Sequence, residues 1–169
     1  MGNVRKAGKA AGCYPEGGKS KQFPAGLSAG LRDGLVAGAV AGLLSGAPST
    51  VHALLTGADP LAAARAAGNL LLPADADRGA LLAAGGVVHM ALSLGWGTVL
   101  AMTARRSSLS PMTAGAVVGA AIAAVDLGLL AHGPIGRRWP LIRALPVGPQ
   151  VADHLVFGAI AGAVLACRG

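Results

Sequence analysis

The chain has 169 residues, of which 53% are hydrophobic, 12% charged and 3% aromatic, and its formal net charge is +7. Soluble domains carry about 25% charged residues, so half that proportion, together with long uncharged runs, excludes an ordinary soluble domain and indicates an integral membrane protein. The runs are continuously apolar and do not alternate with a period of two, which favours membrane helices over a β-barrel.

Residues 1–24 are predicted to form a disordered, basic tail on the cytoplasmic side. A basic segment ahead of a membrane helix is typical of an anchor beside anionic lipid. Nucleic-acid binding is the competing interpretation, but no interleaved aromatic residues and no folded basic module accompany the charge, so we expect no nucleic-acid partner. Cys13 and Cys167 lie near opposite ends of the chain and form no metal or redox spacing. The basic residues of the tail are Arg5, Lys6, Lys9, Lys19 and Lys21.

Glycine recurs at every fourth position of the first apolar stretch, for which we predict a membrane helix over residues 32–55. In water each interior glycine would cost a helix about 1 kcal/mol relative to alanine. In hydrocarbon the backbone must form its hydrogen bonds internally, and glycines four residues apart let a second helix approach closely. We expect a kink at Pro48. The glycines of this series are Gly26, Gly30, Gly34, Gly38, Gly42 and Gly46.

The same stretch could also be a cleaved signal peptide, because Ser45, Gly46 and Ala47 resemble a small-residue cleavage site. A signal peptide would need an unusually long basic segment before its apolar core, and here hydrophobicity resumes after Pro48. We therefore expect an uncleaved membrane helix.

Three further membrane helices are predicted, over residues 79–104, 112–131 and 149–166. The first of these is an uncharged run of 26 residues, ample to span about 30 Å of hydrocarbon. A short interfacial helix is expected over residues 60–72, and an interfacial loop over residues 135–148 with Trp139 at headgroup level. The predicted fold is all-α, with residues 25–169 forming an integral membrane four-helix bundle that has glycine-rich helix packing.

The distribution of Lys and Arg predicts that both termini are cytoplasmic. With that orientation nine basic residues lie inside and five outside, as the positive-inside rule requires. The arginine-rich segment of residues 137–143 then falls outside, where it is either held by its neighbours or dips back as a re-entrant segment.

Four histidines and two aspartates are predicted to gather in the non-cytoplasmic half of the bundle, on the faces that also carry small residues. Three interpretations remain open. The first is structural hydrogen bonding between helices. The second is a site for a transition metal or a proton, and the third is haem held by two histidines. The candidate residues are His89, Asp126 and His154, with His52, His132 and Asp153.

Several short motifs then follow one another along the chain. His89 and Ser93 form a His-x-x-x-Ser pair in the second helix, the third helix ends in His-Gly-Pro at residues 132–134, and Asp153 and His154 open the fourth. After the glycine-spaced first helix, this order resembles the bacterial YagU-like inner-membrane proteins, a family of small four-helix proteins without an assigned biochemical activity. The resemblance covers residues 34–165, although Asp153 stands where the family more often has Glu. It implies the four-helix fold and a location in the bacterial plasma (inner) membrane, and it supplies no catalytic residues.

No nucleophile–base pair, phosphate-binding loop or HExxH zinc motif occurs in the chain, so we expect neither an enzyme nor a cofactor. The main hypothesis is a non-enzymatic, multi-pass membrane protein with a structural or accessory role, in contact with the lipid bilayer and able to self-associate through spare glycine faces. The alternative is a proton or divalent-metal transporter or sensor that uses the His/Asp cluster.

Overall fold

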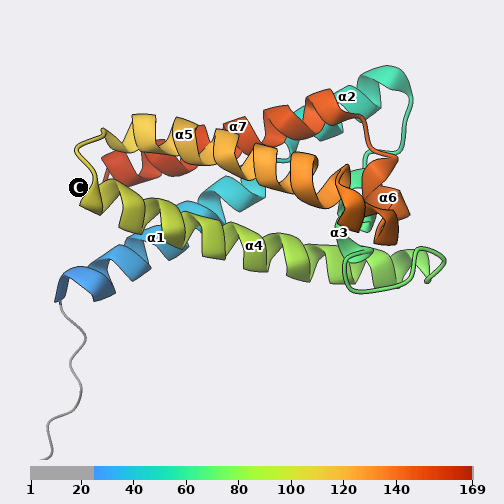
Figure 1. Ribbon diagram of the computed structural model, residues 1–169, viewed down its shortest axis with the longest axis horizontal. Helices are drawn as coiled ribbons and strands as arrows, with labels where there is room; N and C mark the ends of the chain where they lie inside the picture. Colours follow the sequence, from blue (N-terminus) through green and yellow to red (C-terminus); the bar gives the residue numbers. More distant parts are fainter. Residues whose placement is uncertain (1–24, 169) are drawn as a thin grey trace, which may run out of the picture.

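The computed structural model describes residues 25–168, and these form an all-α fold in which four apolar segments lie alongside one another (Figure 1). Each segment is long and apolar enough to cross a membrane, which indicates a multi-pass membrane protein. The predicted all-α fold with four apolar helical segments is confirmed, and no β-strand occurs in the described part. The predicted tail, residues 1–24, lies outside the described residues. The four segments are Ser28–Thr56, Arg78–Arg106, Pro111–Leu129 and Val147–Ala166.

The first membrane segment is two helices, α1 (Ala25–Leu44) and α2 (Ala47–Thr56), rather than one kinked helix over residues 32–55. The interruption falls at Ser45 and Gly46, just before the proline that was expected to cause the kink. Pro48 lies in the first turn of α2, where its missing N–H is not needed. Proline therefore begins a new helix here. α1 packs mainly against α4 (Arg78–Arg106), whereas α2 diverges from α4 and packs against α7 (Val147–Ala166) (Figure 1).

A short helix, α3 (Ala62–Gly68), follows within the predicted stretch of residues 60–72 and packs against the first half of α4. Gly68 faces the backbone of Leu81 and Gly85 faces that of Ala64, so the two helices meet with no side chain between them. The loop before α3 is held by Asp59, whose Oδ2 lies 2.8 Å from Arg65 Nη2 and 3.2 Å from Arg78 Nη2.

The second and third membrane segments begin at side-chain caps. Asp77 accepts hydrogen bonds from the backbone N–H groups of Gly79 and Ala80 at the start of α4, at 2.8 and 3.1 Å. The Ser110 hydroxyl accepts one from the Thr113 N–H at the start of α5 (Pro111–Ala123), at 3.2 Å. From Ala124 the helix continues as a π-helix, η1 (Ala124–Ala131), which the sequence did not indicate.

The chain between η1 and α7 is a compact pair of short helices, η2 (Pro134–Arg138) and α6 (Pro140–Arg143), within the loop predicted over residues 135–148. The membrane helix that follows, α7, begins at Val147, two residues before the predicted start. Asn69, directly after α3, joins this region to the rest of the bundle, because its Oδ1 accepts a hydrogen bond from the Leu141 N–H at 3.3 Å.

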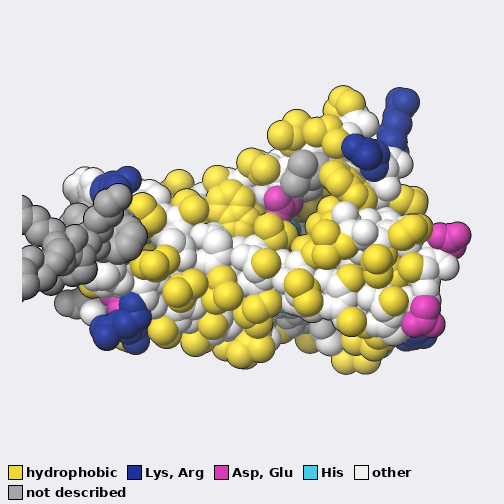
Figure 2. Space-filling view, turned by 90° about the horizontal axis from the view of Figure 1, so that it is seen from below, with side chains coloured by type: hydrophobic (Ala, Val, Ile, Leu, Met, Phe, Trp, Pro, Cys, Tyr) yellow, Lys and Arg dark blue, Asp and Glu magenta, His cyan; other side chains and the backbone are white. Residues whose placement is uncertain are grey.

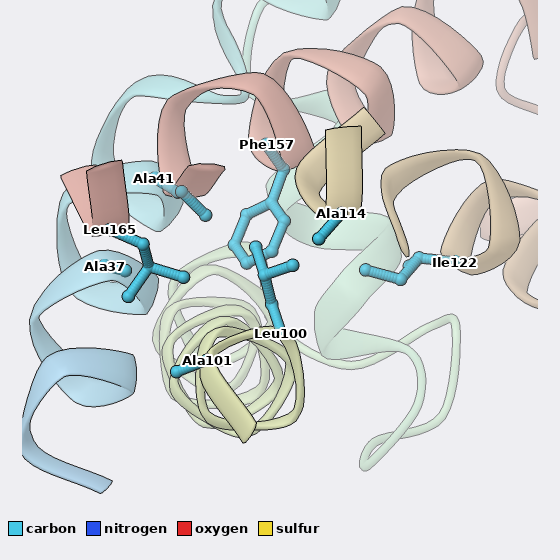
Figure 3. Close-up of a cluster of buried hydrophobic side chains, with 9 residues drawn as sticks. Ala37, Ala41, Leu100, Ala101, Ala114, Ile122, Phe157 and Leu165 are labelled. Atoms are coloured by element: carbon cyan, nitrogen blue, oxygen red, sulfur yellow. The ribbon is translucent and has the colours of Figure 1, made fainter. Parts of the chain in front are cut away.

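The interior of the bundle is built mainly from small residues. Leu100 of α4 is the one large side chain that is fully buried among the described residues, and the Phe157 ring of α7 packs beside it (Figure 3). Around them lie alanines of four helices. Because these side chains are small, the helices can lie close together. The van der Waals contacts of the core then come from closely packed backbones rather than from large side chains. The alanines are Ala37, Ala41, Ala101, Ala114 and Ala161.

Glycines also lie where two pairs of membrane helices approach each other closely. On α4, a Cβ added to Gly97 would stand 2.5 Å from the backbone of Gly34 and Gly38 on α1. Between α5 and α7, a Cβ on Gly119 would stand 2.7 Å from the His154 carbonyl oxygen, and one on Gly162 would stand 2.7 Å from that of Pro111. In the series of glycines four residues apart in the first membrane segment, not every glycine contacts another helix, since Gly46 has open space beside it.

The surface divides into an apolar middle and charged ends. In Figure 2 hydrophobic side chains cover the middle of the molecule, and most of the Lys, Arg, Asp and Glu side chains lie at its two ends. Many leucines and valines are exposed, among them Leu43 at 75% and Leu55 at 82%. An apolar girdle of this kind fits a protein whose sides contact lipid.

Candidate functional site

Polar side chains in the membrane segments meet at the first half of α7. Asp153 and His154 are consecutive in this helix, so their side chains point in directions about 100° apart. Asp153 contacts α2, and His154 contacts η1 on another side. Two consecutive residues of α7 therefore connect this helix to two other elements through polar contacts.

Asp153 caps the start of α2. Its Oδ1 accepts a hydrogen bond from the Ser49 backbone N–H at 3.0 Å, and its Oδ2 accepts a second one from the Ser49 hydroxyl. The N–H groups in the first turn of a helix have no partner within that helix, and a carboxylate is favoured there by the helix dipole. The interruption of the first membrane segment at Gly46 creates this helix start, and α7 supplies the carboxylate that satisfies it.

His154 lies between two oxygen atoms. Its Nδ1 is 2.7 Å from the Gln150 carbonyl oxygen, and its Nε2 is 3.1 Å from Asp126 Oδ2. A carbonyl oxygen can only accept, so Nδ1 carries a proton. The contact between Nε2 and Oδ2 then needs one more proton, held either by the imidazole as a cation or by the carboxyl group. His154 and Asp126 thus share a single proton in this contact.

The π-helix presents Asp126 to His154. An eight-residue π-helix is unusual in length, since most are single turns inside α-helices, often at functional sites. Its wider backbone is seen in the hydrogen bond from the His132 N–H to the Leu127 carbonyl oxygen, at 3.0 Å. The Asp126 side chain is 27% exposed and that of His154 22%, so the pair is neither fully buried nor open.

The other candidate histidines do not join this pair. His89 lies between α4 and α1, where its Nε2 is 2.7 Å from the Gly42 carbonyl oxygen and therefore donates to it. His132 is exposed at the end of η1, beside an apolar cavity of about 330 Å³ that Val147 and Val151 also line. His52 is partly exposed on α2, which packs against α7 and leaves the α1–α4 contact.

The hydrogen-bonded contacts of the six candidate residues are therefore separate within residues 25–168, and their gathering in the non-cytoplasmic half of the bundle stays a prediction. This separation follows from the divergence of α2, together with the directions about 100° apart in which the neighbouring residues Asp153 and His154 of α7 point. Within residues 25–168 no three His, Cys, Asp or Glu side chains are grouped so that they could hold a metal ion. Asp126 and His154 form a pair, Asp153 pairs with Ser49, and His89 pairs with a backbone carbonyl.

A second polar group lies at the other end of the bundle, and the sequence analysis did not identify it. Asp33 Oδ2 is 2.7 Å from Arg105 Nη2, and Asp33 Oδ1 is 2.9 Å from Arg168 Nε. The Asp33 side chain is only 8% exposed. The sequence could have predicted an ion pair here, because an aspartate near the start of an apolar membrane helix needs a cationic partner. The sequence gives no indication of which arginines supply it.

No known protein family, curated protein or solved structure matches this chain. The chemistry of the site therefore rests on its own geometry. The Asp126–His154 pair can hold and exchange a proton. Asp153 can stabilise a helix start, and the described side chains offer no set of ligands for a metal.

Proposed function

We propose that this chain is a non-enzymatic, multi-pass protein of the bacterial plasma membrane with a structural or accessory role, of the YagU-like kind. The observation that carries the proposal is the pairing of the polar side chains within the membrane segments. Asp126 pairs with His154, Asp153 with Ser49 and His89 with the Gly42 carbonyl oxygen, and none of the buried polar side-chain atoms of the described residues lacks a hydrogen bond. Pairing of this kind is what interhelical stabilisation requires.

Self-association through glycine faces is part of the same proposal, but the available faces are few. Glycines four residues apart in α1, α5 and α7 already face a neighbouring helix, namely Gly34 and Gly38, Gly115 and Gly119, and Gly158 and Gly162. Described glycines with open space beside them, such as Gly86 and Gly95, occur singly. A second copy would therefore contact a larger apolar surface, of which a single glycine is only part.

The proposal predicts that the purified protein is folded, free of metal and inactive in proton transport. The tests are elemental analysis of the protein in detergent and proton uptake into liposomes that contain it, followed with an internal pH dye. Uptake equal to that of empty liposomes is the expected result. A bound metal that is lost in His89→Ala or His154→Ala, but kept in the control His132→Ala, would overturn the proposal.

The second candidate function is proton transport or proton sensing, and the single proton shared by Asp126 and His154 favours it over metal transport. This pair is the one contact between two ionisable side chains that joins different membrane segments away from their ends, within residues 25–168. Proton uptake that Asp126→Asn abolishes, while His132→Ala leaves it unchanged, would establish this candidate in place of the first.

For the orientation, we propose that both termini are cytoplasmic. The support is the positive-inside count of the sequence, nine basic residues against five, in which the five basic residues before Ala25 decide the balance. We expect a cysteine at Ser108, in the α4–α5 turn, to be shielded from an impermeant thiol reagent in intact cells, and one at Asp75, before α4, to be labelled. Both are placed in a protein with Cys13 and Cys167 replaced by serine. Labelling at Ser108 with protection at Asp75 would reverse the orientation.

A further inference from the structure

The bundle has a cavity of about 340 Å³ at the end where α1 starts and α4 and α7 finish. This volume lies in the range of small-molecule sites, about 300–1,000 Å³. Arg105, Arg168 and Asp33 provide its polar wall. The remaining wall is formed by apolar side chains of α4, α5 and α7, which are Ala101, Ala104, Pro111 and Leu165.

The polar wall carries more positive than negative charge. One carboxylate, Asp33, accepts a hydrogen bond from one N–H of Arg105 and from one N–H of Arg168, and the exposed Arg32 guanidinium lies 3.9 Å away. A guanidinium has five N–H groups, so most of the donors on each arginine are left for another acceptor. The two side chains are 45% and 30% exposed, whereas Asp33 is buried beneath them. Asp33 thus orients the arginines without neutralising both.

The position of the cavity fits the headgroup level of a bilayer. Arg105 lies in the last turn of α4, Arg168 two residues after the end of α7, and Pro111 at the start of α5. The four membrane segments end at this level, so the arginines lie where lipid phosphates are found. The apolar wall continues from there toward the hydrocarbon. A ligand with a phosphate and an acyl chain would place the phosphate against the polar wall and the acyl chain along the apolar wall.

Charge indicates which lipids fit. A zwitterionic headgroup brings a cation that would face two arginines, with the only carboxylate of the wall already bonded to them. An anionic headgroup brings no such cation. The chain before Ala25 is an unsuitable occupant, since it holds five Lys or Arg residues and a single acidic residue, Glu16.

We propose that this cavity binds the phosphate headgroup of an anionic phospholipid, with the guanidinium groups of Arg105 and Arg168 bonded to the phosphate oxygens and Asp33 holding both arginines in place. Arginine suits this role because its planar fork matches the geometry of phosphate. The inference is independent of the proposed function, since it concerns the opposite end of the bundle.

Native mass spectrometry of the protein in detergent tests the proposal. Phosphatidylglycerol and phosphatidylcholine of equal chain length are titrated in, and inorganic phosphate is tested separately by thermal shift. We expect the wild type to prefer phosphatidylglycerol and Arg168→Gln to lose about fivefold in that preference, the effect of one arginine near an anionic surface. The control Arg143→Gln, at the other end, should retain it.

Asp33→Asn distinguishes lipid binding from a merely structural ion pair. Asparagine keeps an amide oxygen that can still accept from an arginine, but it removes the negative charge. The cavity then carries more net positive charge, so binding of phosphatidylglycerol should increase in a protein that remains folded, opposite in sign to Arg168→Gln. If Arg168→Gln does not fold, Arg168→Lys keeps the positive charge but lacks the planar guanidinium group. A smaller decrease in the preference for phosphatidylglycerol is then expected.

A thermal shift with inorganic phosphate but no lipid preference would assign the site to free phosphate and overturn the lipid assignment. Equal loss in Arg168→Gln and Arg143→Gln, or no preference in the wild type, would overturn the site itself.

Discussion

Replacing Gly97 by leucine is expected to destabilise the protein by at least about 3 kcal/mol, the upper end of the range for overpacked cores. The Cβ alone would stand 2.5 Å from the Cα of Gly38 and from the carbonyl oxygen of Gly34. All the nearest atoms belong to the backbone of α1, so no side-chain rotation can make room. The two helices would have to separate along the contact that α1 depends on most. In mild detergent we expect loss of the folded monomer, measured by thermal denaturation followed by circular dichroism.

Gly95→Leu is the matched control, two residues away on the same helix. Gly95 is exposed and has no atom within 4 Å of an added Cβ. Leucine is the better helix former by about 1 kcal/mol, so this change should be neutral or slightly stabilising. If both variants melted at the same temperature, the close approach of α1 and α4 would not contribute to stability.

The contrast between these two glycines shows what the sequence can and cannot predict. Spacing by four correctly pointed to helices rather than strands, and the lengths of the apolar runs located the four membrane segments. The glycine spacing could not show which glycines face a neighbouring helix. Gly46 belongs to the same series as Gly38 but has open space beside it, because the helix ends there.

The sequence did not predict the break between α1 and α2 at Gly46, because a residue that stabilises the start of α2 lies far along the chain. Locally, Pro48 in an apolar run indicates a kink as readily as a new helix start. The choice depends on Asp153, which is 104 residues from Ser49 and supplies the acceptors for the first turn of α2. A pattern read along one helix contains no information about a cap from another.

The candidate site was predicted in composition but not in grouping. In the third membrane segment the spacing placed small and polar residues on one face, and Gly119 and Asp126 do face His154. Helical periodicity shows on which side of a helix a residue lies, but not how deep its side chain lies or which helix it contacts. The sequence therefore could not show that His89 and His52 lie apart from the Asp126–His154 pair. The π-helix that carries Asp126 has no local sequence signal, since its residues are ordinary helix formers.

The pairing of Asp126 with His154 gives the second large expected effect. Asp126→Ala leaves His154 Nε2 without its partner, and we expect a loss of about 1–3 kcal/mol of stability, with a similar loss for His154→Ala. The double variant should cost less than the sum of the two, by at least about 0.5 kcal/mol, because each single change already removes the shared contact. Unfolding of the reconstituted protein in denaturant, followed by circular dichroism, measures all three.

Asp126→Asn separates the shared proton from the packing. With Nδ1 of His154 donating to the Gln150 carbonyl oxygen, a neutral ring presents Nε2 as an acceptor, and the asparagine amide can donate to it. The hydrogen bond survives without a titratable proton, so Asp126→Asn should cost less stability than Asp126→Ala. The control is the pair Asp126→Ala and His89→Ala, which should be additive because His89 bonds to Gly42 on another face of the bundle. Additivity for His154 as well would mean that Asp126 and His154 are neighbours without an energetic connection, and the proton they share would then have no part in holding η1 against α7.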